Sequence, residues 1–219
     1  MGGLNHFDAV IFDADGTLFD TEEFMRQAWI AVGDEMDNPL PGRDYLDYVG
    51  MNRATILARF RQEYGPGFDG EQFMTRCTQH LQQHIEEEGV PLKPGVREIL
   101  AFLQERNIPI GMATSTHRVR TDRRLELSGL GDYFQSVVTG DEVQKGKPDP
   151  EIYRTVCETL GVTPDRCLAV EDSKNGILSA HAAGLAVAMV PDMIPPTAEL
   201  ESLLWRRVDS LNELIEVLK

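Results

Sequence analysis

Residues 10–25 read VIFDADGTLFDTEEFM, an apolar run that ends abruptly in acidic side chains. Asp13 and Asp15 stand where the apolar run stops, with Gly16 and Thr17 immediately behind them. Two like charges about 4 Å apart cost about 4 kcal/mol at an effective dielectric near 20, so such a pair needs something that holds it. The stretch therefore predicts a strand whose carboxyl end carries a functional site.

Composition narrows the class of protein before any motif is considered. The chain has 219 residues, 42% hydrophobic and 26% charged, which is ordinary for a globular protein with one sizeable core. A net charge of −15 argues against nucleic acid and against anionic membrane surfaces as partners. The chain has three scattered cysteines and nowhere 18 consecutive apolar residues. We therefore expect reduced thiols, no membrane span and a cytoplasmic protein.

Short β-rich runs alternate with helical patterns over most of the chain. The strands are expected at residues 8–13, 108–114, 136–140, 167–172 and 185–190, and the helices between the later four at about 118–128, 150–160 and 173–183. Asp149 is the expected N-cap of the middle helix, with Pro150 at its first position. This alternation predicts the α/β class, with a Rossmann-like parallel sheet covered on both faces.

Residues 22–92 do not follow this alternation. In the segment EQFMTRCTQHLQQHIEEE, apolar side chains recur every four residues, which is one stripe of an amphipathic helix. RATILARF repeats the pattern with Ile56, Leu57 and Phe60. We therefore expect an all-helical domain at 22–92, inserted into an α/β core formed by residues 1–21 and 93–219.

Ligands bind at the carboxyl ends of the strands in parallel sheets. Asp13 and Asp15 follow one expected strand, and Glu171 and Asp172 close another. Converging carboxylates with open positions suit Mg²⁺ together with a phosphate. These four residues are therefore the predicted metal site.

Three further residues extend this site. Lys147, in KGKPDP, would add a cation, and Thr114 and Ser115 would offer a hydroxyl and backbone N–H groups that lead into a helix. A carboxylate nucleophile, a metal, a lysine and a hydroxyl together indicate phosphoryl transfer through an aspartyl-phosphate. Simpler interpretations remain open at this point: Thr114 and Ser115 could cap the helix near Arg118.

The same ambiguity applies to other candidates. Glu171 and Asp172 could cap the helix that starts near Ser173. His80 and His84 lie four residues apart, but without a glutamate at the position that zinc proteases require, we expect a solvated face.

Taken in order and spacing, the pieces resemble the haloacid dehalogenase superfamily of phosphohydrolases. The matching segments are DADGTLFDT (13–21), ATST (113–116), GKPDPEIY (146–153) and VEDSKNG (170–176), followed by AAG (182–184). The resemblance covers essentially the whole chain. With the helical insertion after the first motif, it points to the subgroup of β-phosphoglucomutase and small sugar-phosphate phosphatases.

The resemblance implies specific roles. Asp13 would be the nucleophile and a Mg²⁺ ligand, and Asp15 the general acid and base, with its backbone carbonyl on the metal. Asp172 would bind the metal directly, and Glu171 would reach it through water or orient its ligands.

The resemblance also implies how the substrate is held. Thr114 and Lys147 would bind the transferring phosphoryl group, with Ser115 beside them. Arg53, in VGMNRAT, matches the segment where the phosphoglucomutases place a substrate-binding arginine, although an arginine at a helix start is also routine surface chemistry. The helical domain would be a cap that closes over the site and excludes water.

Single residues distinguish a phosphatase from other enzymes of the superfamily. Dehalogenases of this superfamily lack the counterpart of Asp15, so its presence favours a phosphate ester. The main enzyme alternative is a hexose-phosphate mutase, whose branch carries a histidine where this chain has Met25. A non-catalytic phospho-acceptor module of the response-regulator kind fits neither the helical insertion nor the motif order. We predict a monomeric, Mg²⁺-dependent phosphatase acting on a small phosphomonoester, a sugar phosphate by preference.

Overall fold

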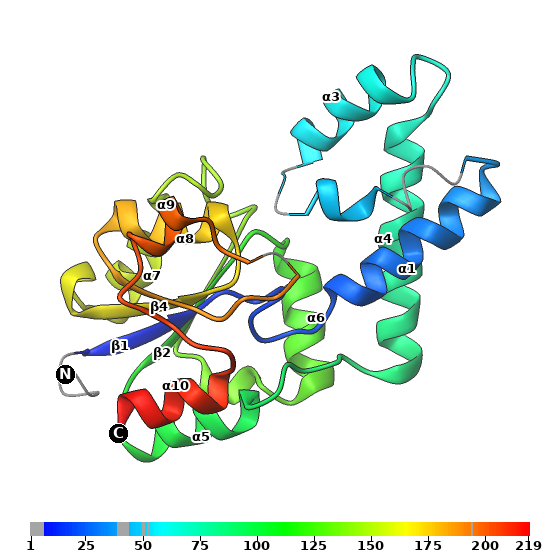
Figure 1. Ribbon diagram of the computed structural model, residues 1–219. Helices are drawn as coiled ribbons and strands as arrows, with labels where there is room; N and C mark the ends of the chain where they lie inside the picture. The colour runs from blue at the N-terminus through cyan, green and yellow to red at the C-terminus, as the bar shows by residue number, and fades with distance from the viewer. Residues whose placement is uncertain (1–6, 39–43, 50, 52, 194) are drawn as a thin grey trace. The chain divides into compact units, whose positions relative to one another are not determined.

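In the described part of the chain, six parallel strands form one sheet in the order β3-β2-β1-β4-β5-β6. Its strands β1, β2 and β4 are labelled in Figure 1. This computed structural model describes residues 7–38, 44–49, 51, 53–193 and 195–219. The strands are β1 (Ala9–Phe12), β2 (Ile110–Thr114), β3 (Ser136–Thr139), β4 (Cys167–Glu171), β5 (Ala186–Met189) and β6 (Arg206–Arg207). The α-helices are α1 (Glu22–Glu35), α3 (Arg53–Glu63), α4 (Gly70–Glu88), α5 (Val96–Glu105), α6 (Arg118–Ser128), α7 (Glu151–Leu160), α8 (Lys174–Ala183), α9 (Ala198–Glu201) and α10 (Leu211–Leu218). The α/β class is confirmed.

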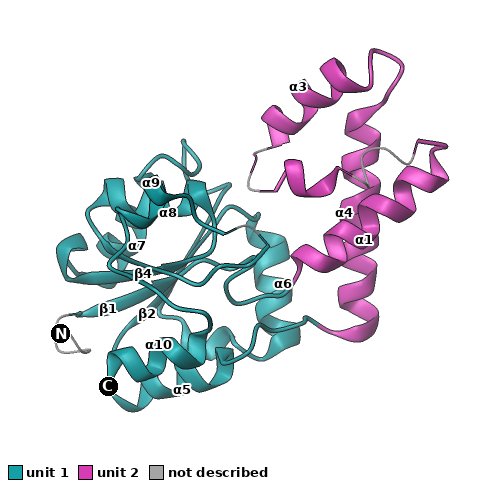
Figure 2. Cartoon of the chain, viewed as in Figure 1, with its two compact units in different colours: residues 1–20, 90–219 teal, residues 21–89 magenta. Residues whose placement is uncertain are grey.

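The chain divides into two compact units (Figure 2). The α/β unit comprises residues 1–20 and 90–219, and the helical unit comprises residues 21–89. None of the helices in the described parts of the chain combines the length and apolarity needed to cross a membrane.

The sheet is buried on both faces, as its near-continuous apolar strands predict. Side chains alternate along β1: Val10 and Phe12 join an apolar cluster with α5, α6 and α10, whereas Ala9 and Ile11 join a second cluster with α7 and α8. All four are completely buried. Because β1 and β4 lie in the centre of the sheet, the residues that follow them are held by a rigid base.

Two details of the sequence prediction need correction. Helix α7 begins at Glu151 with Pro150 as its N-cap, one residue later than predicted. The Asp149 side chain still accepts a hydrogen bond from the Glu151 N–H (3.1 Å), so it serves the start of the helix from one position earlier. Strand β6 was not predicted, because its two arginines are exposed and form no apolar run.

The helical unit has an aromatic core. Trp29 of α1 lies 5.5 Å from Phe60 of α3 and 5.2 Å from Phe73 of α4, measured between ring centroids. The predicted stripe of α4 is confirmed: its four buried apolar side chains are Phe73, Cys77, Leu81 and Ile85. On α3, Ile56 is buried as expected, and Leu57 is only half-buried.

Two short segments of the α/β unit flank the insertion and pair with each other. The Asp20 N–H donates to the Pro91 carbonyl and the Lys93 N–H to the Leu18 carbonyl, each at 2.9 Å. Phe19 and Leu92 form an antiparallel bridge between them. The chain therefore leaves and re-enters the α/β unit through one hydrogen-bonded pair of segments.

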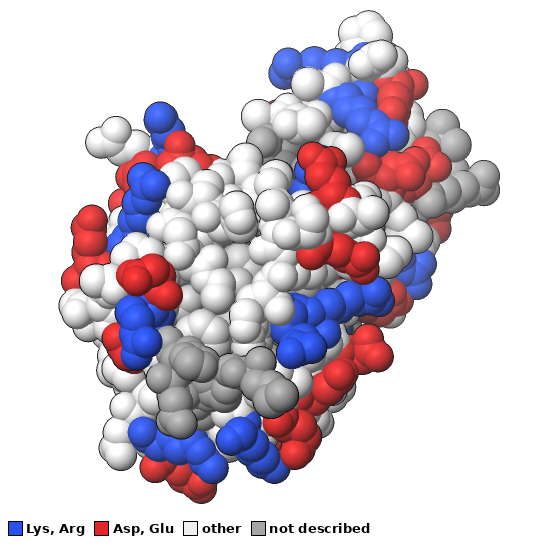
Figure 3. Space-filling model, turned by 60° about the vertical axis from the view of Figure 1, so that its left-hand side comes forward, with Lys and Arg blue, Asp and Glu red and all other residues white. Residues whose placement is uncertain are grey.

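Basic and acidic side chains are interspersed on the face shown in Figure 3, and the basic ones form no continuous surface there. Considered over the whole described chain and not only this face, several surface charges are paired, such as Arg166 with Asp8 (2.8 Å) and Arg123 with Glu126 (2.7 Å). Solvent-exposed pairs of this kind contribute about 0–1 kcal/mol each.

Candidate active site

Asp13 lies one residue beyond β1 and is almost completely buried (7% exposed). Its N–H continues the sheet by donating to the Val170 carbonyl of β4 at 2.9 Å. A tight loop follows, in which the Ala14 carbonyl accepts the N–H groups of Leu18 and Phe19. The strand and the loop together fix where the Asp13 carboxylate lies.

Lys147 joins Asp13 to β2 and β4. Its ammonium contacts Asp13 Oδ1 at 2.5 Å, Glu171 Oε1 at 2.6 Å and the Ala113 carbonyl at 2.9 Å, so all three of its protons have acceptors. Burial lowers the pKa of Lys147, but the two carboxylates outweigh this effect and raise it, so the side chain is a cation. Burial also raises the pKa of Asp13, and the charge of Lys147 opposes that shift.

Glu171, the last residue of β4, is fully buried and has donors on both of its oxygens. The Tyr153 hydroxyl donates to Oε1 at 2.7 Å, and the Ser173 hydroxyl donates to Oε2 at 3.1 Å. Burial, and then the Glu171 charge, raise the pKa of Tyr153 well above its usual range, so this hydroxyl acts as a donor. A Cβ on Gly176 would lie 1.9 Å from the Glu171 carboxyl carbon, so only glycine leaves room for this carboxylate.

Three carboxylates converge at this edge of the sheet. One oxygen each of Asp13, Glu171 and Asp172 lies within 4.8 Å of the others. Thr17 Oγ1 donates to Asp172 Oδ1 at 3.3 Å. Three converging carboxylates supply the hard oxygen donors that a divalent ion such as Mg²⁺ prefers. Mg²⁺ binds carboxylates and keeps open positions for phosphate and water. The donor set of this chain therefore fits the metal that the sequence predicts.

Asp15 is partly exposed and has donors on both of its oxygens. The Thr116 hydroxyl donates to Oδ2 at 2.7 Å, and the Arg124 guanidinium of α6 forms a short ion pair with Oδ1. Arg124 is buried, whereas the side chain of Asp15 is 27% exposed. The structure thus places the second aspartate at the rim of the site, fixed by the segment that follows β2.

The capping interpretations of the motif residues are wrong. The N-cap of α6 is His117, without a side-chain cap, whereas buried Thr114 accepts a hydrogen bond from the Thr116 N–H at 3.1 Å and Ser115 is exposed. The N-cap of α8 is Ser173, whose hydroxyl accepts the Gly176 N–H. Glu171 and Asp172 are therefore not needed to begin that helix.

Arg53 belongs to the helical unit. Its guanidinium contacts Glu71 Oε2 at 2.7 Å, and its side chain is 47% exposed. The structure thus places Arg53 at the surface of that unit, at the first position of α3.

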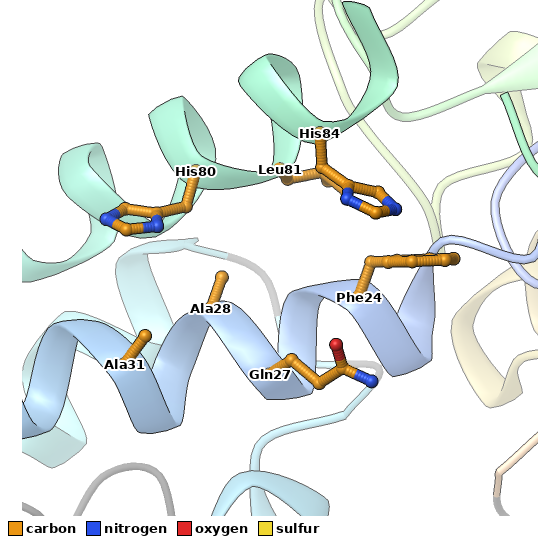
Figure 4. Close-up of a pocket in the computed structure, with 7 residues that line it drawn as sticks. All are labelled: Phe24, Gln27, Ala28, Ala31, His80, Leu81 and His84. Atoms are coloured by element: carbon orange, nitrogen blue, oxygen red, sulfur yellow. The ribbon is translucent and has the colours of Figure 1, made fainter. Parts of the chain in front are cut away.

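The helical unit has a cavity of about 170 Å³ between α1 and α4 (Figure 4). It is lined by Phe24, Gln27, Ala28, Ala31, His80, Leu81 and His84. The two histidine rings point to different places: His84 stacks on Phe24 with ring centroids 4.1 Å apart, and His80 Nε2 lies 3.4 Å from Glu35. Among the described residues, the carboxylates of the α/β unit form the sole cluster that could hold a metal.

Sequence reasoning missed several residues of the site. Tyr153 and Thr116 lie inside the matching motifs without a residue pattern that gives them a role, and Arg124 lies outside every motif. A signal for Arg124 existed: it shares the buried face of α6 with Thr121, Leu125 and Ser128. A cation in that helical stripe needs a buried partner.

Comparison with known proteins identifies the family of this chain. The family model of haloacid dehalogenase-like hydrolases matches residues 7–184. A phosphorylated carbohydrates phosphatase of Thermotoga maritima is 35% identical over 178 residues, which cover 81% of this chain and 82% of the relative. Hexitol phosphatase B of Escherichia coli is 30% identical, with coverage of 84% and 83%. The structure of CbbY from Rhodobacter sphaeroides, in complex with xylulose-(1,5)bisphosphate, has a TM-score of 0.76 at 26% identity and covers 95% of this chain and 96% of its own.

The chain therefore belongs to the haloacid dehalogenase-like hydrolases. Within that family it is a phosphoric monoester hydrolase of the β-phosphoglucomutase-like and sugar-phosphatase subgroup.

Proposed function

We propose that the chain is a Mg²⁺-dependent phosphatase that hydrolyses a phosphorylated carbohydrate through an aspartyl-phosphate on Asp13. The observation that carries the proposal is the buried Lys147 ammonium between Asp13 and Glu171, next to Asp172. A cation at this place favours a charged nucleophile and would also face the negative charge of a transferring phosphoryl group. The phosphatases among the relatives support a carbohydrate phosphate as the substrate class.

The proposed reaction has two steps. An oxygen of Asp13 attacks phosphorus, the bond from phosphorus to the leaving oxygen breaks, and Asp15 gives that oxygen a proton. Water then attacks the same phosphorus while Asp15 takes its proton, the bond to Asp13 breaks, and inorganic phosphate leaves. Asp15 thereby returns to its protonated form, and Asp13 is free for the next cycle.

The metal would be held by Asp13, Asp172 and the backbone carbonyl of Asp15, with Glu171 acting through water. When bound, Mg²⁺ supplies charge neutralisation for the phosphate and for the converging carboxylates. Lys147 and Thr114 would hold the phosphoryl oxygens, with Ser115 at the end of β2 as a further donor. General acid–base catalysis contributes about 10²–10⁴-fold, so charge stabilisation must supply most of the acceleration that phosphate monoesters need.

We assign the helical unit the role of a cap. It is inserted between β1 and α5 through the paired segments 18–20 and 91–93, which would let it move as one body. Arg53, exposed on α3, would recognise a group of the substrate distant from the phosphate. The proposal also includes a cytoplasmic monomer, and the three free cysteines are consistent with a reducing compartment.

A mutase is the specific competitor, because a solved Thermotoga maritima structure provisionally described as a β-phosphoglucomutase has a TM-score of 0.79 at 32% identity and covers 96% of this chain and 97% of its own. Met25, half-buried in α1, stands where the mutase branch is expected to carry a histidine. A thioether has no proton to donate, which favours hydrolysis.

The test follows the fate of the phosphate. The protein, dialysed against EDTA, is given Mg²⁺ and a panel that includes β-glucose 1-phosphate, and phosphate release is measured while NMR follows the sugars. We expect inorganic phosphate without a bisphosphate activator, no activity before Mg²⁺ is added, and inhibition by Ca²⁺, whose looser coordination misplaces the nucleophile. Full activity in EDTA would overturn the metal assignment, and isomerised sugar phosphate that outpaces phosphate release would identify a mutase.

A further inference from the structure

Arg124 is a buried cation whose charged partner is the proposed acid and base. It lies on the inner face of α6, 4% exposed, and its guanidinium pairs with Asp15 Oδ1. Its Nε is buried without a hydrogen-bond partner among the described residues, so the ion pair with Asp15 is its main compensation for burial. Burial of a guanidinium costs desolvation free energy, so we look for a role of Arg124 beyond packing.

Thr116 holds the other oxygen of the same carboxylate. Its hydroxyl donates to Asp15 Oδ2 at 2.7 Å. Thr116 is itself fixed, because its N–H donates to Thr114 Oγ1 at 3.1 Å and its carbonyl accepts the Gly140 N–H at 3.2 Å. Each Asp15 oxygen is thus held by a different donor, and both donors come from the segment that follows β2.

Helix α6 gives Arg124 a rigid base. Thr121, Leu125 and Ser128 are buried on the same face, and the Ser128 carbonyl accepts a hydrogen bond from Arg97 of α5 at 2.7 Å. The neighbouring Arg123 differs in burial and in partner, because its side chain is 39% exposed and pairs with Glu126 on the surface. The helix therefore provides its own matched control.

We propose that Arg124 is a positioning residue that, together with Thr116, holds the Asp15 carboxyl group where it can exchange a proton with the leaving oxygen and then with water. This inference rests on the proposed function, because it assigns a partner to the acid and base of that reaction. Asp15 stands on a loop two residues beyond Asp13 and has a partly exposed side chain. The two donors restrict that side chain to one orientation, which both proton transfers require.

Two substrates with different leaving groups show whether Arg124 positions Asp15 or only supports the fold. Nitrophenolate leaves without a proton, so the first step on p-nitrophenyl phosphate does not need Asp15, whereas the second step needs it for every substrate. A protein with misplaced Asp15 should therefore be phosphorylated quickly by p-nitrophenyl phosphate and then discharge slowly. A sugar phosphate, whose alkoxide needs a proton, should be slowed already in the first step.

The experiment compares R124M with R123M, using p-nitrophenyl phosphate and glucose 6-phosphate in rapid-quench and steady-state measurements. For R124M we expect a burst of about one nitrophenolate per active site, slow turnover afterwards, and kcat on glucose 6-phosphate lowered about 10²-fold or more, up to the 10⁴-fold that acid–base catalysis supplies. R123M should match wild type on both substrates. R124K, which keeps the charge but not the planar geometry, should recover part of the loss.

T116V removes only the second donor and keeps the test valid should R124M not fold. It should show the same burst with a smaller loss. Equal losses on both substrates without a burst, or unchanged kcat in R124M and T116V, would overturn the inference. Failure of the proposed function is a separate result, because wild type and R123M would then release no phosphate from either compound.

Discussion

The α/β unit and the helical unit bury different kinds of side chain. The buried charged side chains among the described residues, such as Asp13, Arg124 and Glu171, all lie in the α/β unit, and these two carboxylates stand where β1 and β4 end. The helical unit buries aromatic rings and keeps its charges in exposed pairs such as Arg76 with Glu35. The first unit accepts the cost of buried charges, whereas the helical unit keeps its charges at the surface and buries only uncharged polar groups, such as the Trp29 indole N–H, which has no hydrogen-bond partner among the described residues.

The two units should therefore respond differently to substitutions of their charged residues. Buried charges in the α/β unit are connected through Lys147, Tyr153 and Arg124, so changing one of them disturbs its partners. The exposed side chains of the helical unit have few such dependencies and can vary without loss of the fold. A charge removed from the α/β unit should affect both stability and activity, whereas an exposed charge removed from the helical unit should leave stability nearly unchanged.

Removal of the Lys147 cation should have the largest effect. Lys147→Met leaves two buried carboxylates facing each other, which should lower the free energy of unfolding by about 3–5 kcal/mol and phosphate release by at least about 10²–10³-fold. Lys145→Met, two residues earlier with a 74% exposed side chain, is the control and should change neither. Chemical denaturation and steady-state kinetics measure both quantities. Similar kinetics for the two variants would contradict the central position of Lys147.

Phe60→Ala tests the aromatic core of the helical unit. The side chain is 1% exposed, so its loss should cost about 3–5 kcal/mol, confined to residues 21–89. Hydrogen exchange should show lost protection in α1, α3 and α4 while β1 and β4 keep theirs. Leu46→Ala, on a side chain that is 53% exposed, should be nearly neutral. Equal loss of protection in the sheet would show that the two units do not unfold separately.

Gly16→Ala tests how closely the loop after β1 approaches the metal site. Gly16 has φ +82°, and a Cβ there would lie 2.3 Å from Asp172 Oδ2. We expect Mg²⁺ affinity, measured by calorimetry, to fall about 10-fold or more, together with a loss of about 1–2 kcal/mol of stability. Gly129→Ala has a similar φ of +67° with nothing within 4 Å of the added carbon. It should lose stability without losing Mg²⁺ affinity, and a shared loss of affinity would refute the steric explanation.

Arg53→Ala should have the smallest effect and sharpen the role of the helical unit. Because its side chain is half-exposed, the change should raise KM for a sugar phosphate by up to about fivefold, the equivalent of about 1 kcal/mol. KM for p-nitrophenyl phosphate should not change, since that compound lacks a distant polar group. Arg61→Ala, an exposed arginine of the same helix, is the control. Identical KM values for Arg53→Ala and wild type on every substrate would remove Arg53 from substrate recognition.

Much of the α/β unit could be predicted because its local patterns agree with its burial. The strands are apolar runs in which successive side chains are buried on opposite faces, and their ends are marked by Asp13, Thr114 and Asp172. Motif spacing brought out Lys147 as well, although its place between two carboxylates depends on packing among three separate segments. Nothing in the sequence near Lys147 specifies that its partners are Asp13 and Glu171.

Other features could not be predicted, because they depend on contacts between segments that are distant in the sequence. Strand β6 has no apolar run, so only its pairing with β5 defines it. Arg124 looks like one of several arginines on α6 until helical periodicity is combined with the position of Asp15. In the helical unit, periodicity predicts buried stripes, but it says nothing about exposed residues, and only the resemblance of VGMNRAT to a substrate-binding segment singled out Arg53.

The most direct test of the proposed chemistry is whether phosphate becomes attached to Asp13. The protein is mixed with Mg²⁺ and ³²P-labelled sugar phosphate, quenched in acid during turnover, digested, and analysed by mass spectrometry. We expect a hydroxylamine-sensitive phosphate on the peptide that contains Asp13, and neither label nor phosphate release in a folded Asp13→Asn variant. Label on any other residue, or more than a tenth of wild-type turnover in that variant, would contradict the account.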